Sequence, residues 1–509
     1  MPIVRPAPAP HTPHARFANA PWHDDHPQRR ALAQRLPPDH LARRVEAAVH
    51  RLNLRALHDA YAGTGSHAHP PALLLRAVLF ETQRGHHSPA TWFRDAHECE
   101  PLRWLLRGCC PSRSCWYAFK DRVAPLLTSL NAQPLTLAVD AALTPATRGA
   151  EDGTLVAANA SRHRLLNEAR LDQRLTLLAA AIAADRRGET PAVVPAWMAK
   201  WPHGRRQQQQ QFTKARLQLS SRHARNLRKS PSKQTAKARV VISVSDPEAA
   251  LGLDKEKVFR PLYNTQLVDD LDSPFILGYE VFAQPNDAGL VGTMMERVQV
   301  LTGRRLEQLL ADTAYAGGAD LKAAATAGVL VYAPLPAEPT GAVKQLPKSQ
   351  FTWLAAEQTY VCPQGQRLVL EAAGAKKRSG PETVVVKRYR CPPVHCLACP
   401  LAAACALKPA SGRTVSRSEH EEEIEALRER MGSAEAQALY KLRRQTVELV
   451  NADWKEHRKL RRFSGRGLER ARCQVGLIVL VHNLLTLLKE EAKAKAAAAA
   501  AANAAQIAT

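Results

Sequence analysis

The order of strand-like and helix-like patterns between residues 239 and 333 constrains the fold more than any other feature of the chain. Three strand-like runs come first, and two helical patterns then alternate with two further apolar runs. Strands followed by alternating helices and strands are typical of a mixed sheet, so we expect a mixed α/β core. The strand-like runs are 239–244, 262–268, 275–282, 309–311 and 328–333, the helical patterns are 289–302 and 317–327, and earlier strand-like signals lie at 138–140 and 153–157.

The N-terminal part has a helical pattern instead. Apolar residues recur at helical spacing from Leu41 to Leu52, and Ser88 and Ser112 stand at typical helix starts. Several short helices joined by tight turns are typical of a helix-turn-helix-like DNA-binding domain. A plain helical bundle would produce the same pattern.

The charge balance limits the class of partner. Lys and Arg number 71 against 47 Asp and Glu, a net charge of +24. This surplus favours a polyanion, because each phosphate neutralised by Lys or Arg releases a condensed counterion. A ribosome-associated protein or a membrane-surface binder would also be basic, but no basic amphipathic segment favours a membrane. Without an apolar stretch of about 18 residues or a signal-like start, we expect a cytoplasmic protein that binds no membrane.

Residues 162–238 interrupt the core pattern with a polar, basic stretch that includes five consecutive glutamines at 207–211. The glutamine run is of low complexity, and the Lys-, Arg- and Ser-rich run that follows at 221–237 indicates a solvated face or a disordered insertion. The net charge of the chain favours contact with the DNA backbone instead.

Two acidic residues stand where a sheet could present them. Asp152 precedes Gly153 at the start of a strand-like run, although Asp-Gly is more often only a turn. Asp312 follows the apolar run 306–311 and precedes a Gly-containing turn. Its carboxylate would then lie at the carboxyl edge of a sheet, where α/β proteins gather ligands. A helix N-cap is an equally good interpretation of Asp312 taken alone.

A third acidic residue, Glu448, lies in a pattern typical of an α-helix. Tyr440, Arg444 and Glu448 recur every four residues and Lys455 follows seven later, so they would share one stripe of a helix. A solvated face with salt bridges would have the same pattern. Apolar neighbours such as Trp454 indicate that this side of the helix is not simply exposed. A carboxylate beside cationic groups is what a phosphodiester site needs.

Five cysteines cluster between residues 362 and 405. In a reducing compartment, clustered cysteines indicate metal more than disulfide. Cys396-x-x-Cys399 with flanking thiols offers the tetrahedral ligands that Zn²⁺ prefers, and zinc would stabilise a small insertion with little core of its own. Metal-free reduced thiols are the alternative, and the spacing favours zinc. The candidate ligands are Cys391, Cys396, Cys399, Cys405 and Cys362.

Taken in order, these motifs resemble the DDE-class insertion-sequence transposases of bacteria. The likeness is carried by Gly-Thr after Asp152, by Ala-Asp-Thr-Ala-Tyr around Asp312, and by the Glu448 helix followed by Arg-Phe-Ser-Gly-Arg-Gly-Leu-Glu-Arg. It extends from about residue 69 to 488. The chain departs from the family in the Glu448 helix, where the family leaves two residues between Tyr and Arg. Three residues separate Tyr440 from Arg444, so Arg443 is the alternative.

The resemblance implies a fold and a chemistry. The fold would be mixed α+β, with an RNase H-like catalytic core, an N-terminal helical domain and a cysteine-rich insertion. Asp152, Asp312 and Glu448 would hold Mg²⁺ (or Mn²⁺), with Asp152 bridging two ions. Water would attack DNA at the insertion-sequence end, and the freed 3′-hydroxyl would attack target DNA. The implied DNA-contacting residues are Tyr440, Arg444, Lys455, Arg462 and Arg466.

The implied partner is double-stranded DNA, both the transposon ends and the target, bound in the bacterial cytoplasm at the nucleoid. Pairing two ends implies a dimer or a larger assembly on DNA. Two other interpretations stay open. One is a non-catalytic DNA-binding relic or repurposed transposase, and the other is a plain metal-dependent nuclease that cuts without joining.

The patterns together predict the domain organisation. The expected parts are a flexible arm (1–35), a helical N-terminal DNA-binding domain (36–135), the first part of the catalytic core (136–344, interrupted by the 162–238 insertion), a cysteine-rich insertion with a candidate zinc site (345–412), C-terminal core helices that carry Glu448 (413–489) and an Ala-rich tail, either a frayed helix or disordered (490–509).

Overall fold

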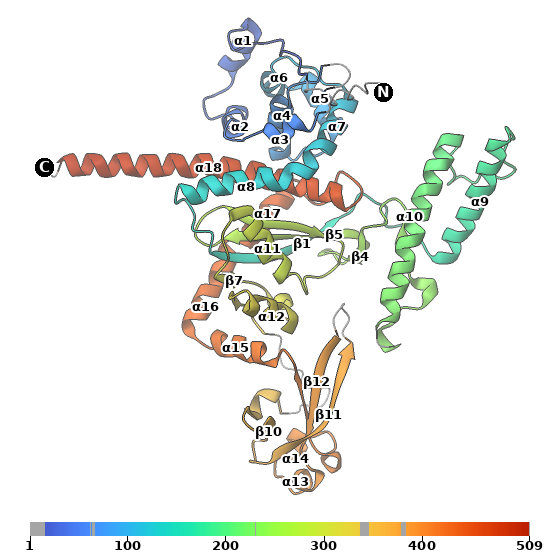
Figure 1. Cartoon of the computed structure of the whole chain (residues 1–509), viewed down its shortest axis with the longest axis vertical. Helices are drawn as coiled ribbons and strands as arrows, with labels where there is room; N and C mark the ends of the chain where they lie inside the picture. Colours follow the sequence, from blue (N-terminus) through green and yellow to red (C-terminus); the bar gives the residue numbers. More distant parts are fainter. Residues whose placement is uncertain are drawn as a thin grey trace, which may run out of the picture.

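A mixed sheet lies at the centre of the computed structural model, which describes residues 16–61, 63, 67–229, 231–335, 346–377 and 383–507 (Figure 1). The strand order is β4-β5-β1-β7-β8, and β6 also pairs with β5. β5 is antiparallel to β1, β4 and β6, whereas β7 is parallel to both β1 and β8. The predicted mixed sheet is confirmed, although the predicted strand 239–244 lies outside it and 250–253 was not predicted. The strands are β1 (Arg148–Ala157), β4 (Ala250–Leu253), β5 (Phe259–Asp270), β6 (Ile276–Phe282), β7 (Gln308–Leu310) and β8 (Leu330–Tyr332).

Side chains alternate between the two faces of this sheet, so neighbouring residues join different cores. Val268, Leu277 and Leu309 pack on the side of α11 (Val291–Thr302) and α12 (Gly318–Thr326). Leu267, Ile276 and Leu310 pack on the opposite side, against α17 (Val447–Glu456) and α18 (Leu468–Ile507). The face toward α17 is the one that carries the candidate site.

Helices form the N-terminal part, and α18 joins this part to the core. Leu480 and Leu484 of α18 pack into the apolar cluster of the N-terminal helices. Ser88 and Ser112 cap α5 and α7, as the sequence predicted. The helices are α1 (Pro27–Arg35), α2 (Leu41–Val49), α3 (Arg55–Asp59), α4 (Pro71–Gln83), α5 (Pro89–Glu98), α6 (Glu100–Leu105), α7 (Arg113–Val123) and α8 (Leu127–Asp140).

Two expectations for this part differ from the structure. Residues 138–140 lie at the end of α8 and not in a strand, because a helical pattern with buried Leu135 and Ala138 continues through them. Of the predicted flexible arm, residues 1–15 lie outside the described residues, whereas α1 is folded and Trp22 is buried.

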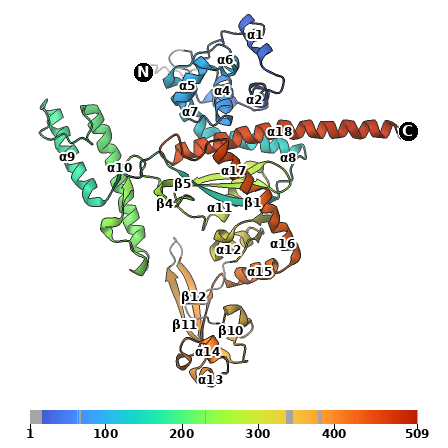
Figure 2. The ribbon, with the colours of Figure 1, turned by 180° about the vertical axis from the view of Figure 1, so that it is seen from behind.

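The polar segment after β1 folds into a helical hairpin that stands apart from the sheet (Figures 1 and 2). α9 (Glu168–Arg186) and α10 (Pro202–Leu227) pack around their own apolar cluster, and β2 (Leu165–Leu166) pairs with β3 (Ile242–Ser243) at the base. The five glutamines lie inside α10, so the segment is helical and not disordered. Glutamine is a good helix former, which explains the difference.

The cysteine-rich segment forms a separate antiparallel sheet of order β13-β12-β11-β10-β9. Three helices, α15 to α17, lead back to the core, and α18 continues through the Ala-rich tail to Ile507. α18 is long and apolar enough to cross a membrane, but 78% of its apolar window is buried, as in a core helix. The elements are β9 (Thr352–Leu354), β10 (Thr359–Val361), β11 (Arg367–Lys377), β12 (Thr383–Arg390), α13 (Pro393–Leu397), α14 (Ala402–Cys405), β13 (Thr414–Ser418), α15 (Glu421–Met431) and α16 (Ala434–Lys441).

Candidate functional site

Asp152 and Asp312 come from neighbouring parallel strands. Ala150 of β1 pairs with Leu310 of β7, and each aspartate lies two residues further along its chain. Since side chains alternate, Asp152 shares a face with Ala150. Burial raises the pKa of Asp152, and the charge of Asp312 adds to this shift.

The local structure around each aspartate refines the prediction. Asp152 is central in β1 and not at its start. Asp312 fits both of its interpretations, because it follows β7 and also caps the 3₁₀ turn η4 (Thr313–Tyr315). Its Oδ1 accepts a hydrogen bond from the Ala314 N–H at 2.7 Å.

α17 brings Glu448 to the same place. The guanidinium of Arg443 donates to Glu448 Oε1 at 2.9 Å and to Asp152 Oδ1 at 2.7 Å. Asn451, one turn further along α17, donates from Nδ2 to Asp152 Oδ2 at 2.8 Å. Burial raises the pKa of Tyr440, and the charges of Asp312 and Glu448 add to that shift. Arg443 therefore links Asp152 to Glu448, although the two are far apart in the sequence, and Asp312 follows the strand next to Asp152.

The predicted single helical stripe through Tyr440, Arg444 and Glu448 is wrong. The 3₁₀ turn η7 (Leu442–Gln445) separates α16 from α17, and Thr446 has φ −113° and ψ −101°, outside the helical region. This break turns Arg443 toward the carboxylates. Arg443 is buried, whereas Arg444 is exposed.

The other predicted DNA-contacting residues are Lys455 of α17 and two arginines beyond the end of β1. Burial lowers the pKa of Lys455, and the charge of Lys255 acts in the same direction. Arg462 and Arg466 are exposed and donate to the carbonyl oxygens of Ala160 at 3.2 Å and Asn159 at 3.3 Å, just beyond the end of β1. They form a cationic border next to the base of the helical hairpin.

Two residues that contact the carboxylates are not among the predicted site residues. Asn451 is not predicted, and Arg443 is predicted only as an alternative to Arg444. Asn451 follows Glu448 by three residues and so shares its helix face, which is a signal for Asn451. The family spacing from Tyr440 is a signal for Arg443. Neither signal reveals the contact with Asp152, which the tertiary fold creates.

Four of the five predicted zinc ligands lie in or against the apolar cluster of the cysteine-rich segment. Cys391, Cys396 and Cys405 belong to this cluster, and Cys362 packs against it. Backbone N–H groups donate to two of the sulfurs, Gln366 to Cys362 Sγ at 3.3 Å and Arg413 to Cys396 Sγ at 3.4 Å. Burial raises the pKa of Cys391 to about 12, and the neighbouring Cys396 thiol adds to this shift.

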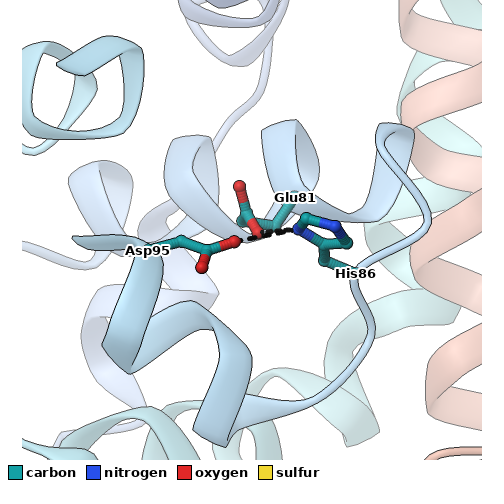
Figure 3. A group of neighbouring side chains, drawn as sticks. All are labelled: Glu81, His86 and Asp95. Atoms are coloured by element: carbon teal, nitrogen blue, oxygen red, sulfur yellow. Dashed lines mark hydrogen bonds and ion pairs between the residues drawn. The ribbon is translucent and has the colours of Figure 1, made fainter. Parts of the chain in front are cut away.

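A separate acidic group lies between α4 and α5 (Figure 3). Ligand-type atoms of Glu81, His86 and Asp95 all lie within 4.8 Å of one another. His86 Nδ1 contacts Glu81 at 2.7 Å and Asp95 at 3.0 Å, while Arg84 and Arg94 form ion pairs with the same two carboxylates. The group therefore joins α4 to α5 through a network of ion pairs.

Comparison with known families gives two matches. Residues 30–122 match a transposase domain family (DUF772), and residues 361–488 match the transposase DDE domain family. The second match includes Glu448, whereas Asp152 and Asp312 precede it. No curated protein and no solved structure matches the chain. Both matched segments are similar to transposase families, and they support the resemblance of the chain to the DDE-class insertion-sequence transposases.

Proposed function

We propose that this protein cuts DNA at insertion-sequence ends and joins the freed ends to target DNA, with divalent metal ions held by Asp152, Asp312 and Glu448. One observation carries the proposal. A single cationic group, the Arg443 guanidinium, contacts both Asp152 and Glu448, and Asp312 follows the strand next to Asp152. Two carboxylates that lie close enough to contact one guanidinium are suited to bind Mg²⁺ or Mn²⁺, because these ions prefer oxygen ligands.

The reaction consists of two phosphoryl transfers. Water attacks a phosphorus atom at the insertion-sequence end, the P–O3′ bond breaks, and a 3′-hydroxyl is released. That hydroxyl attacks a target phosphodiester, forms the new bond and releases a target 3′-hydroxyl. When bound, the metal ions activate the attacking oxygen and stabilise the leaving one.

The chain's own residues hold this machinery in place. Asn451 orients Asp152 through its hydrogen bond, and the buried Arg443 keeps the Asp152 and Glu448 carboxylates together. Tyr440, Arg444 and Lys455 are suited to contact the phosphates next to the scissile bond, with Arg462 and Arg466 further along the same strand of DNA.

We also propose an RNase H-like core, supported by the central β1 with antiparallel β5 on one side and parallel β7 on the other. Double-stranded DNA is the partner, and a dimer or larger assembly on paired ends is expected. The protein would act in the bacterial cytoplasm at the nucleoid.

A structural zinc ion in the cysteine-rich segment is part of the proposal. The N–H···S bonds to Cys362 and Cys396 orient these sulfurs. Burial raises the pKa of Cys391, the neighbouring Cys396 thiol adds to the shift, and the two would repel one another as thiolates. A bound cation removes that repulsion. Cys362, Cys391, Cys396, Cys399 and Cys405 supply more than the four ligands that zinc needs.

A strand-transfer assay with Mg²⁺ tests the proposal against a non-catalytic relic and a plain nuclease. Linear DNA ending in the element's own termini is incubated with plasmid target, and cut and joined products are measured separately. We expect wild type to cut and join, and Asp312→Asn to do neither while still binding DNA. Cutting without joining would favour the nuclease, and full activity of Asp312→Asn would refute the carboxylate site.

A further inference from the structure

The helical hairpin carries most of the net charge of the protein. Residues 162–239 contain 18 Lys and Arg against 4 Asp and Glu, a net +14 of the total +24. Between Glu189 and Asp246 the chain has no acidic residue and has 12 cationic ones. This excess of positive charge is larger than a solvated helix face needs, because ordinary protein surfaces mix positive and negative side chains.

The hairpin is a folded arm with a core of its own. Leu171, Leu178, Phe212 and Leu219 are buried between α9 and α10, and the Trp197 ring stacks on Phe212 with centroids 5.8 Å apart. The 26 residues of α10 span about 39 Å at 1.5 Å per residue. The arm therefore presents its charges on a rigid support that stands out from the core (Figure 2).

Only part of this charge is neutralised within the protein. Arg205 pairs with Asp185, Arg216 with Glu168 and Lys214 with Glu248. Other cations are exposed and have no acidic partner in the part of the chain that the structure describes. They include four close together at the end of α10 and just beyond it: Arg225, Arg228, Lys229 and Lys233.

The base of the arm adjoins the cationic border of the candidate site. Residues 159–160, which connect β1 to the arm, accept hydrogen bonds from Arg462 and Arg466. Glu248 links both parts, because it pairs with Lys214 of α10 and accepts from the Leu468 N–H at the start of α18. A duplex lying along Arg462 and Arg466 would continue toward the arm.

We propose that α9 and α10 form a second DNA-binding surface, which holds the phosphate backbone of duplex DNA that extends beyond the carboxylate site. The partner follows from the charge, the rigidity and the position of the arm, and its assignment to DNA rests on the proposed function. Phosphate contacts of this kind position the duplex without reading its sequence.

Duplex DNA binding by the full chain, measured over a range of salt concentrations, tests this surface. The arm variant replaces Arg225, Arg228, Lys229 and Lys233 with Gln, and the matched control replaces four exposed cations on other surfaces, Arg304, Arg305, Lys489 and Lys495. Each lost phosphate contact lowers the slope of log affinity against log salt by about 0.9. If all four cations contact phosphates, we expect the arm variant to lose about 3.6 units of slope and on the order of 10- to 100-fold in affinity at low salt.

Equal affinity and slope in the arm and control variants would overturn the proposal. So would a change in oligomeric state without a change in DNA binding, which would assign the arm to contact between copies of the protein. Circular dichroism of both variants checks that the arm stays helical. Cutting is not measured in this assay, so its outcome is independent of the Asp312→Asn test of the carboxylate chemistry.

Discussion

His87 makes the contact between the N-terminal helices and the core sensitive to pH. The side chain is buried, and its Nε2–H donates to the carbonyl oxygen of Arg458 at 2.6 Å. The His87 carbonyl oxygen accepts from Lys120 Nζ at 3.3 Å and from Ser464 Oγ at 3.0 Å. Burial lowers the pKa of His87 to about 4, against an ordinary value of 6.5, and the charge of Lys120 acts in the same direction.

The sign and size of the effect follow from this shift. Above pH 6.5 His87 is neutral in both the folded and unfolded states. As the pH falls from 6.5 toward 4, the unfolded chain takes up a proton that the folded protein does not, so stability is lost. A difference of about 2.5 pKa units corresponds to about 3 kcal/mol in the free energy of unfolding, reached near pH 4.

A His87→Gln variant isolates this contribution, because its amide N–H can still donate to the Arg458 carbonyl and does not titrate. Urea denaturation of both proteins is measured between pH 7 and pH 4, together with hydrogen exchange of the α4–α5 connection. We expect wild type to lose about 3 kcal/mol more than the variant over this range. Other histidines, including His482, are common to both proteins and cancel. Parallel pH profiles would refute the reasoning.

Three further predictions concern the site and its support. Asn451→Leu removes a hydrogen bond to a charged group, worth about 1.5–3 kcal/mol, so single-turnover cutting should fall roughly 10- to 100-fold while DNA affinity is unchanged; unchanged cutting would contradict the role of Asn451. Purified protein should contain stoichiometric zinc, and Cys391→Ser should lose it by elemental analysis, whereas Cys110→Ser, at an exposed thiol outside the cluster, should keep it. Trp454→Ala empties a fully buried position beneath α17 and should cost about 3–5 kcal/mol in urea denaturation; a loss under 1 kcal/mol would contradict the packing of this helix.

The central sheet could be predicted because its strands carry a local signal. The β5 segment alternates between apolar and polar residues, and the β6 segment is mostly apolar. Both patterns can be read from the sequence without knowledge of the tertiary contacts. Helix caps at Ser88 and Ser112 were predicted for the same reason, since a side chain bonds to its own next turn.

Other features depend on contacts that the sequence does not display. α10 looked like a low-complexity run because its glutamines hide the buried stripe through Phe212 and Leu219, which needs α9 as a partner. The break at Thr446 separates two helix-like patterns that look continuous in the sequence. Arg443 contacts a carboxylate 291 residues away, and only the fold reveals this contact.

Cutting of the polypeptide by bound Fe²⁺ tests the central claim most directly. Fe²⁺ in place of Mg²⁺, with ascorbate and peroxide, generates hydroxyl radicals that cleave the backbone next to the metal. The proposed site predicts cuts close to Asp152, Asp312 and Glu448, all suppressed by excess Mg²⁺ and all absent in Asp152→Asn. Cuts near one of these residues alone, or cuts that excess Mg²⁺ does not suppress, would contradict a shared metal site.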